Sequence, residues 1–123
     1  MANDFKSFSK ANIAKDDTTY STLYTVPYSS ADVEAILLEV DIANTTSSDI
    51  TVDCKLNKNS GGTGGTDDIF IVKQAPVPAG GALKVVSGQK IVMMSTSTGA
   101  DTVTVAASVA SAADCIVSLL EGV

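Results

Sequence analysis

Alternation of apolar and polar residues between Glu34 and Leu56 is the feature that most constrains the fold of this chain. A spacing of two is typical of strands with one buried face and one solvent face. The polar residues 44–48 between the two runs predict a turn, so we expect a long antiparallel hairpin. The side chains expected to face the core are Ile36, Leu38, Val40 and Ile42, followed by Ile50, Val52, Cys54 and Leu56. Those expected to face solvent are Glu39, Asp41, Thr51, Asp53 and Lys55.

Short β-prone segments separated by turn residues make up most of the remaining chain, and no segment has a convincing helical period. Proline and glycine between Pro76 and Gly81, and again Ser87 to Gln89, predict turns. The expected strands are 21–26, 69–72, 83–86, 91–94, 101–106 and 115–120. With 123 residues the chain is long enough for one domain. The pattern predicts an all-β fold, an antiparallel β-sandwich or small barrel of seven to eight strands over residues 20–123.

Two segments are candidates for contacts with other subunits. Residues 1–19 form either a first strand or an N-terminal arm, and carry Phe5, Phe8 and Ile13 in a polar setting. These side chains either dock on a neighbouring subunit or cap the core of their own domain. The second candidate is the run Ile69, Phe70, Ile71 and Val72. Because this run is apolar on both faces, it is either covered on both sides or lies at a subunit contact.

Charge and composition exclude several kinds of partner. The net charge is −6 and the eight basic residues are all lysines scattered along the chain, so direct nucleic-acid binding is not expected. No apolar run approaches the roughly 18 residues of a membrane helix, so no membrane partner is expected. The N-terminus lacks the apolar core of a signal peptide, which favours a cytosolic setting. There Cys54 and Cys115 are expected to be buried thiols, with a disulfide between them as the alternative.

The residues offer little for catalysis or cofactor binding. The chain contains no histidine, the commonest general base. The carboxylate pairs at 16–17 and 67–68 are adjacent in sequence, so on a strand their side chains would point to opposite faces. The glycine-rich segment 57–66 lacks the Gly-Lys-Ser/Thr ending of a phosphate loop and is followed by Asp67 and Asp68. We therefore predict no enzyme, no catalytic residue, no cofactor and no metal site.

Several short motifs resemble small virion proteins of tailed phages, especially cyanophages. They are Met1–Phe8, Leu23–Pro27, Asp41–Val52, Ala75–Leu83, Gly88–Val92 and Ser118–Glu121, so the resemblance extends along most of the chain from its first residues to its last. The glycine-rich loop Gly61–Gly65 and the two cysteines depart from the resemblance, and leave open an added surface role or a covalent lock.

The resemblance implies a non-enzymatic structural part of the virion, assembled in the host cytoplasm. We expect a capsid decoration or cement protein that binds the major capsid protein and stabilises the shell. It would also self-associate, with a trimer as the expected form, since symmetric assembly is common for such modules. A neck, collar, tail or baseplate component is the alternative. A glycan-binding β-module ranks last, because Trp is absent and Tyr20, Tyr24 and Tyr28 are the only tyrosines.

Overall fold

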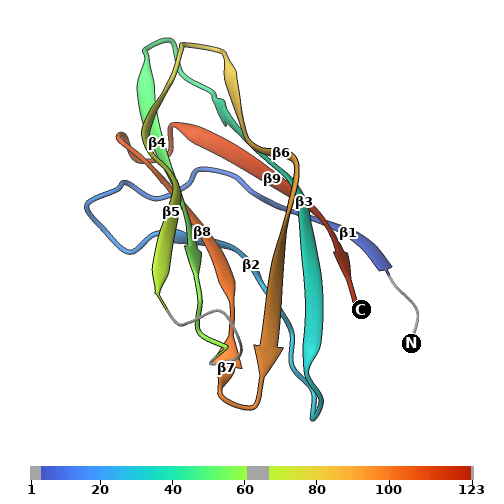
Figure 1. Cartoon of the computed structure of the whole chain (residues 1–123). Coiled ribbons are helices and arrows are strands. Elements are labelled where there is room, and N and C mark those ends of the chain that lie inside the picture. Colours follow the sequence, from blue (N-terminus) through green and yellow to red (C-terminus); the bar gives the residue numbers. More distant parts are fainter. Residues whose placement is uncertain (1–3, 61–66, 123) are drawn as a thin grey trace.

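A computed structural model describes residues 4–60 and 67–122, which fold into nine β-strands in two layers (Figure 1). The strands are β1 (Asp4–Lys10), β2 (Ser21–Thr25), β3 (Val33–Asn44), β4 (Ile50–Asn57), β5 (Asp68–Val77), β6 (Ala82–Thr96), β7 (Gly99–Ala100), β8 (Thr102–Ala107) and β9 (Ala113–Glu121). The described ranges contain no helix, and so none that is long and apolar enough to cross a membrane.

The two sheets have the strand order of a jelly roll. One sheet has five strands in the order β1-β9-β3-β6-β7, and the other has four in the order β2-β8-β4-β5. All pairings within the sheets are antiparallel. Without the two-residue β7, each sheet has four strands. The chain crosses between the two sheets, which face each other as in double-sheet jelly rolls. The prediction of an all-β antiparallel sandwich is confirmed, with nine strands in place of seven to eight.

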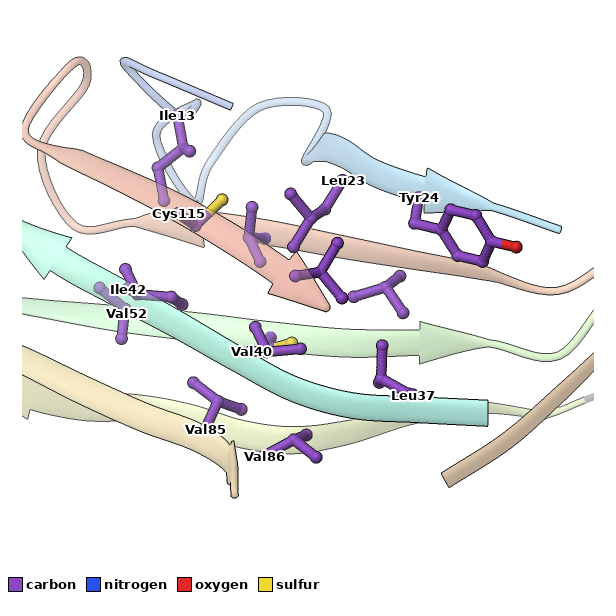
Figure 2. Close-up of a cluster of buried hydrophobic side chains, with 14 of the residues drawn as sticks. Ile13, Leu23, Tyr24, Leu37, Val40, Ile42, Val52, Val85, Val86 and Cys115 are labelled. Atoms are coloured by element: carbon purple, nitrogen blue, oxygen red, sulfur yellow. The ribbon is translucent and has the colours of Figure 1, made fainter. Parts of the chain in front are cut away.

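The core lies between the facing sheets and consists mostly of branched aliphatic side chains (Figure 2). Leu37, Val40 and Ile42 point inward from the five-stranded sheet, and Val52 meets them from the four-stranded sheet. Each such side chain stabilises the fold by about 1.5–3 kcal/mol when it is fully buried. Together these contacts hold both sheets rigidly, and the sheets in turn position the outer faces.

The predicted hairpin from Glu34 to Leu56 is wrong. β3 belongs to the five-stranded sheet and β4 to the four-stranded sheet, so the turn carries the chain from one layer to the other. Asn44 fixes this crossing: its Nδ2 donates to the carbonyls of Ser48 (2.7 Å) and Val77 (3.1 Å), and its Oδ1 accepts from the Thr46 amide (2.9 Å). In this arrangement the apolar faces of both strands meet across the core, whereas a hairpin would leave them side by side.

The predicted facing of β3 is right for its second half and wrong for its first. Val40 and Ile42 are buried as expected, but Ala35 and Leu37 are buried in place of Ile36 and Leu38. The register of β3 against both β6 and β9 shifts between Leu37 and Glu39. An extra residue in a strand reverses the inward and outward alternation beyond it. The bulge therefore turns Ile36 and Leu38 to the outer face.

Two further predictions, one about β6 and one about Asp53, are wrong. The segments 83–86 and 91–94 were predicted as separate strands, but β6 continues through the predicted turn as one irregular strand paired with β3. Asp53 was expected in solvent and is buried. Its carboxylate accepts hydrogen bonds from the Tyr20 hydroxyl (2.5 Å) and the Gln74 amide (2.6 Å). The residues of β4 that were predicted to face the core are all buried, and so are Val103 and Val105 of β8. These predictions are confirmed.

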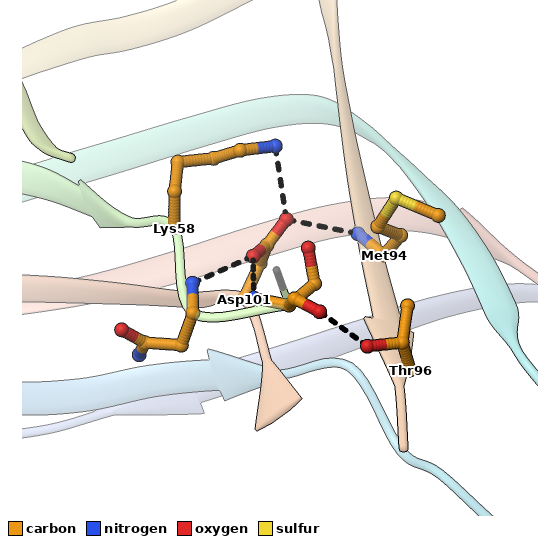
Figure 3. Close-up of polar contacts among 6 residues, drawn as sticks. Lys58, Met94, Thr96 and Asp101 are labelled. Atoms are coloured by element: carbon orange, nitrogen blue, oxygen red, sulfur yellow. Dashed lines mark hydrogen bonds and ion pairs between the residues drawn. The ribbon is translucent and has the colours of Figure 1, made fainter. Parts of the chain in front are cut away.

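One end of the sandwich is closed around the buried carboxylate of Asp101 (Figure 3). Its Oδ1 accepts hydrogen bonds from the amides of Asn59 (2.9 Å) and Ser60 (3.0 Å). Its Oδ2 accepts from the Met94 amide (3.1 Å) and lies 3.1 Å from Lys58 Nζ. These bonds tie residues 58–60 to β6 and to the start of β8.

The N-terminal segment lies on the sandwich as the edge strand β1. Every residue from Asp4 to Lys10 is paired in register with β9. Beyond it, Ile13 is fully buried in the core, and its amide donates to the Ala113 carbonyl (3.0 Å). The sequence left two alternatives for residues 1–19, a first strand or an N-terminal arm. Residues 4–10 form a first strand.

Candidate assembly surfaces

Four apolar side chains line up across the outer face of the five-stranded sheet. Phe5 on β1 is directly opposite Leu120 on β9. Leu120 is opposite Ile36 on β3, and Ile36 is opposite Val92 on β6. Opposed residues on neighbouring strands have Cβ atoms about 4.5–5.5 Å apart, so the four form one continuous strip, which we call the apolar row. Its two ends are the most open, with Phe5 80% and Val92 59% exposed.

A shallow hollow of about 350 Å³ adjoins the Phe5 end of the apolar row. It is lined by Phe5, Lys6, Ser7, Leu38, Ser118 and Leu119. Leu38 is available there because the β3 bulge turns it outward. The sequence did not predict this apolar surface, because strict alternation along β3 would place Ile36 and Leu38 in the core.

Carboxylates border the same outer face. Lys84 on β6 lies 3.5 Å from Glu39 and 3.8 Å from Asp41 on β3. Burial raises the pKa of Asp41, and the adjacent Glu39 carboxylate raises it further. The hydrogen bond to Asp41, together with the Lys84 charge, lowers the pKa of Glu39. Asp41 Oδ1 is buried and accepts no hydrogen bond from the described residues. Lys84 therefore leaves this carboxylate oxygen without a hydrogen-bond donor.

A second hollow on this face, of about 190 Å³, combines acidic and apolar groups. Its lining is Asp41, Ala43, Asp114, Cys115 and Ile116. Asp41 and Asp114 supply the acidic part of this lining, while Ala43 and Ile116 supply apolar atoms. We refer to the apolar row, Leu38, the carboxylates Glu39, Asp41 and Asp114, and Ile116 together as the acidic apolar face.

The four-stranded sheet presents a different feature at its edge strand β5. Phe70 is partly exposed, with Lys73 Nζ 4.7 Å and Lys55 Nζ 5.4 Å from the centre of its ring. Ile69 beside it is also exposed. A lysine ammonium near an aromatic face is attracted by the ring's quadrupole, so an apolar ring and two positive charges are held together. Ile69 is opposite the core-facing Leu56, on the other side of the strand from Phe70. We call Phe70, Lys55 and Lys73 the Phe70 cluster.

The structure places the predicted interface residues in three different settings. Phe5, Ile69 and Phe70 are exposed, and Ile71 and Val72 are half-buried on β5. Phe8 is half-buried against Tyr24, edge to face, with ring centres 5.1 Å apart. Ile13 is a core residue, so its side chain is not available to a partner. The glycine-rich loop Gly61–Gly65 lies outside the described residues.

Lys6, Tyr24 and Glu121 fasten β1 to the sandwich. Lys6 Nζ lies 2.7 Å from Glu121 Oε1, and the Tyr24 hydroxyl donates to Glu121 Oε2. Burial tends to raise the pKa of Glu121, but the Lys6 and Tyr24 hydrogen bonds outweigh it and the net pKa is lowered. Burial and the Glu121 hydrogen bond raise the pKa of Tyr24. These contacts fix the strand that carries Phe5.

A polar groove of about 400 Å³ runs over the outer face of the four-stranded sheet. It is lined by Thr18, Thr19, Tyr20, Thr22, Lys55, Asn57, Asn59, Thr102 and Thr104. Sugars are usually held on an open aromatic face, and Tyr20 is the aromatic residue in this lining. Lys55 Nζ already lies 4.8 Å from its ring centre, and its hydroxyl is bonded to Asp53. The groove therefore lacks an open aromatic platform.

The two cysteines are buried free thiols that point into the core from opposite sheets. Burial raises the pKa of Cys54 and of Cys115 to about 12 each. At neutral pH both stay protonated, and a protonated thiol is a poor nucleophile and metal ligand. Within residues 4–60 and 67–122, no group of three or more His, Cys, Asp or Glu side chains is arranged to hold a metal ion.

Comparison with known proteins is informative only at the level of structure. No protein-family model and no curated protein matches the sequence. The VP2 subviral particle of infectious bursal disease virus contains a chain similar in fold, with a TM-score of 0.51, 9% identity and 97% of this chain covered. This chain spans about a third (32%) of the length of that VP2 chain.

Two weaker similarities were also found. A structure of the Gx strain of the same virus has a TM-score of 0.43 at 8% identity, covering 98% of this chain and 41% of that one. A protein of the disulfide-linked pili on Bacillus endospores has a TM-score of 0.43 at 18% identity, covering 98% of this chain and 86% of that one. At such identities the VP2 likeness supports the fold alone, and one fold can serve many functions.

Proposed function

We propose that the protein is a non-enzymatic structural subunit of a virus particle, and that it decorates the capsid of a tailed phage. There it binds the major capsid protein, or other virion subunits, and stabilises the shell. Assembly takes place in the host cytoplasm, after which the protein is part of the virion. Neither nucleic acid nor membrane is a direct partner in this proposal.

The observation that carries the proposal is the apolar row. Phe5, Leu120, Ile36 and Val92 form a strip across four strands of a sheet that no part of this domain covers within the described residues. Contiguous exposed apolar surface of this kind marks protein–protein contacts. The jelly-roll fold, which occurs in viral capsid domains, and the motifs that resemble those of phage virion proteins support a contact inside a particle.

Self-association is the second part of the proposal, with a trimer as the expected form. Symmetric assembly of identical copies is the usual state of soluble oligomers. The mass of the purified protein in solution, measured by light scattering, tests this part. A monomer at every concentration up to the millimolar range would contradict it.

Quantitative mass spectrometry of purified virions tests the location. A copy number comparable to that of the major capsid protein supports decoration of the shell. A small copy number supports the alternative, a neck, collar, tail or baseplate component. Absence of the protein from washed, infectious particles overturns the proposal. A density map of the intact particle then places the subunit directly.

A further inference from the structure

We infer that copies of this chain associate head to tail, with the Phe70 cluster of one copy docked on the acidic apolar face of the next. This inference rests on the self-association proposed above, and names the two surfaces that carry it.

The two surfaces are complementary in chemistry. The acidic apolar face offers the exposed ends Phe5 and Val92 and, further along β3 and β9 on the same face, the carboxylates of Glu39, Asp41 and Asp114. The Phe70 cluster offers a partly exposed aromatic ring with two lysine ammonium groups beside it. Apolar surface and opposite charge therefore match in a single contact, which gives both affinity and orientation.

The two hollows on the acidic apolar face match the aromatic and the charged parts of the Phe70 cluster. The hollow beside Phe5 and Leu38, about 350 Å³, suits an aromatic ring. The smaller hollow between Asp41 and Asp114, about 190 Å³, suits a lysine side chain, since its apolar lining can contact the methylenes. The carboxylates of Asp41 and Asp114 at the edge of this hollow would attract the ammonium group, in competition with Lys84, whose Nζ lies 3.8 Å from Asp41 Oδ1.

Pairing of two identical faces is less favourable. If two acidic apolar faces met, the carboxylates of one copy would approach those of the other, and Lys84, which lies near Glu39 and Asp41, would offset them only in part. Like charges across an interface oppose association, and the chain already carries a net charge of −6. The head-to-tail contact instead brings lysines to the carboxylates.

The positions of the two surfaces allow one copy to use both. The acidic apolar face is the outside of the five-stranded sheet, whereas Phe70 and Lys55 lie on the four-stranded sheet, the opposite layer of the sandwich (Figure 1). Contacts between two unlike surfaces continue from copy to copy until rotation closes a ring, and otherwise give an open chain. A ring of three is the form that the proposed trimer would take.

Two blocked variants and their mixture test the inference. Phe70→Glu places an acid in the Phe70 cluster and blocks one surface. The double variant Phe5→Lys with Val92→Lys blocks the other, at two exposed positions where the fold should tolerate lysine. Val109→Glu is the matched control, because Val109 is 51% exposed, between Phe70 (39%) and Val92 (59%), lies in the turn before β9 and belongs to neither surface.

Sedimentation and light scattering should show association of the unmodified chain and of Val109→Glu. Each blocked variant should dissociate roughly thirtyfold more readily, the size of a hot-spot effect. An equal mixture of the two variants should form dimers and nothing larger, because each still has one intact surface. Raising the salt concentration should weaken the mixed dimer, since charges contribute to it.

Three outcomes overturn the inference. They are a mixture that stays monomeric, a Phe70→Glu variant that associates like the unmodified chain, and an unmodified chain that is monomeric throughout. Circular dichroism and melting of each variant confirm that it is folded. Phe70→Ala with Lys73→Glu replaces Phe70→Glu if that variant is unfolded, and Phe5→Ser with Val92→Ser replaces the double lysine variant in the same case. If the mixture fails while virions still contain the protein in many copies, the head-to-tail contact is wrong and the proposed location stands.

Discussion

Carboxylates inside the sandwich and carboxylates on its acidic apolar face are partnered in different ways. Asp101 is fully buried, and its two oxygens accept three backbone amides and lie beside Lys58 (Figure 3). Asp41 and Glu39 on the outer face share Lys84 at 3.5 and 3.8 Å, and Asp41 Oδ1 accepts no hydrogen bond. The interior charge is satisfied by its own chain, whereas the outer pair is not.

The pKa shifts follow this difference. The amides and Lys58 outweigh the burial of Asp101 and lower its pKa. Burial and the neighbouring carboxylate raise the pKa of Asp41. A lowered carboxylate pKa stabilises the fold at neutral pH, and a raised one destabilises it. Asp101 therefore stabilises the fold at neutral pH and Asp41 does not, while the pKa of Glu39, next to Lys84, is lowered.

The largest expected effect is that of Asp101→Ala. Removing this carboxylate leaves Lys58 and three backbone amides without their partner in a buried setting. Breaking a buried charge pair from one side typically costs about 3–5 kcal/mol. Urea denaturation should show a loss of this order. Asp32→Ala, at an exposed position, should stay within about 0.5 kcal/mol, and equal losses in both variants would contradict the contrast drawn here.

A smaller loss is expected from Glu121→Gln. The amide keeps the shape of the side chain but loses the charge that binds Lys6 and the Tyr24 hydroxyl. Hydrogen bonds to charged groups contribute about 1.5–3 kcal/mol, and partial exposure of Lys6 places the expected loss at the lower end. Hydrogen exchange of the β1 amides should also become faster. Glu34→Gln on β3, an exposed carboxylate, is the control, and faster exchange in it would remove the specific role of Glu121.

The sequence predicted the interior better than the outer faces. Alternation along β4 and β8 placed Val52, Cys54, Val103 and Val105 in the core, because a period of two survives wherever a strand is regular. It failed along β3, where a bulge after Leu37 reverses the facing of the residues before it. A bulge is set by pairing with both neighbouring strands, and those partners are far away in sequence.

The candidate surfaces were predicted only in part, for the same reason. Phe5 and Phe70 stood out as apolar residues in unusual settings. The apolar row was missed because its members come from four strands that are brought side by side only by the jelly-roll order. Lys73 and Lys55 near Phe70 likewise depend on the pairing of β4 with β5. The turn at Asn44 could signal a chain reversal, but nothing local distinguishes a hairpin from a crossing between layers.

Mild acid should have a smaller effect than either substitution. Asp101 and Glu121 have lowered pKa values, so their contribution to stability is complete above the unfolded values, about 3.9 and 4.3, and is lost as the pH falls through the folded values. Stability should therefore begin to fall as the pH drops from 5 towards 4. Urea midpoints measured across this range should fall less steeply in Glu121→Gln, and an unchanged slope would contradict this origin.

The smallest expected effect on stability, and the most informative on function, is that of Asp41→Asn. Because the pKa of Asp41 is raised, the charged form is disfavoured in the fold: its stabilising contribution is present at low pH and lost as the pH rises through the folded value. At neutral pH the asparagine variant should therefore be as stable as the unmodified chain or slightly more so, within about 0.5 kcal/mol. Its self-association should nevertheless weaken, because a lysine from the next copy would lose its partner. Asp32→Asn, at an exposed position before β3, removes a carboxylate charge that belongs to neither surface and is the control. A substantial loss of stability in Asp41→Asn would show that this carboxylate serves the fold after all, and unchanged association would remove it from the contact.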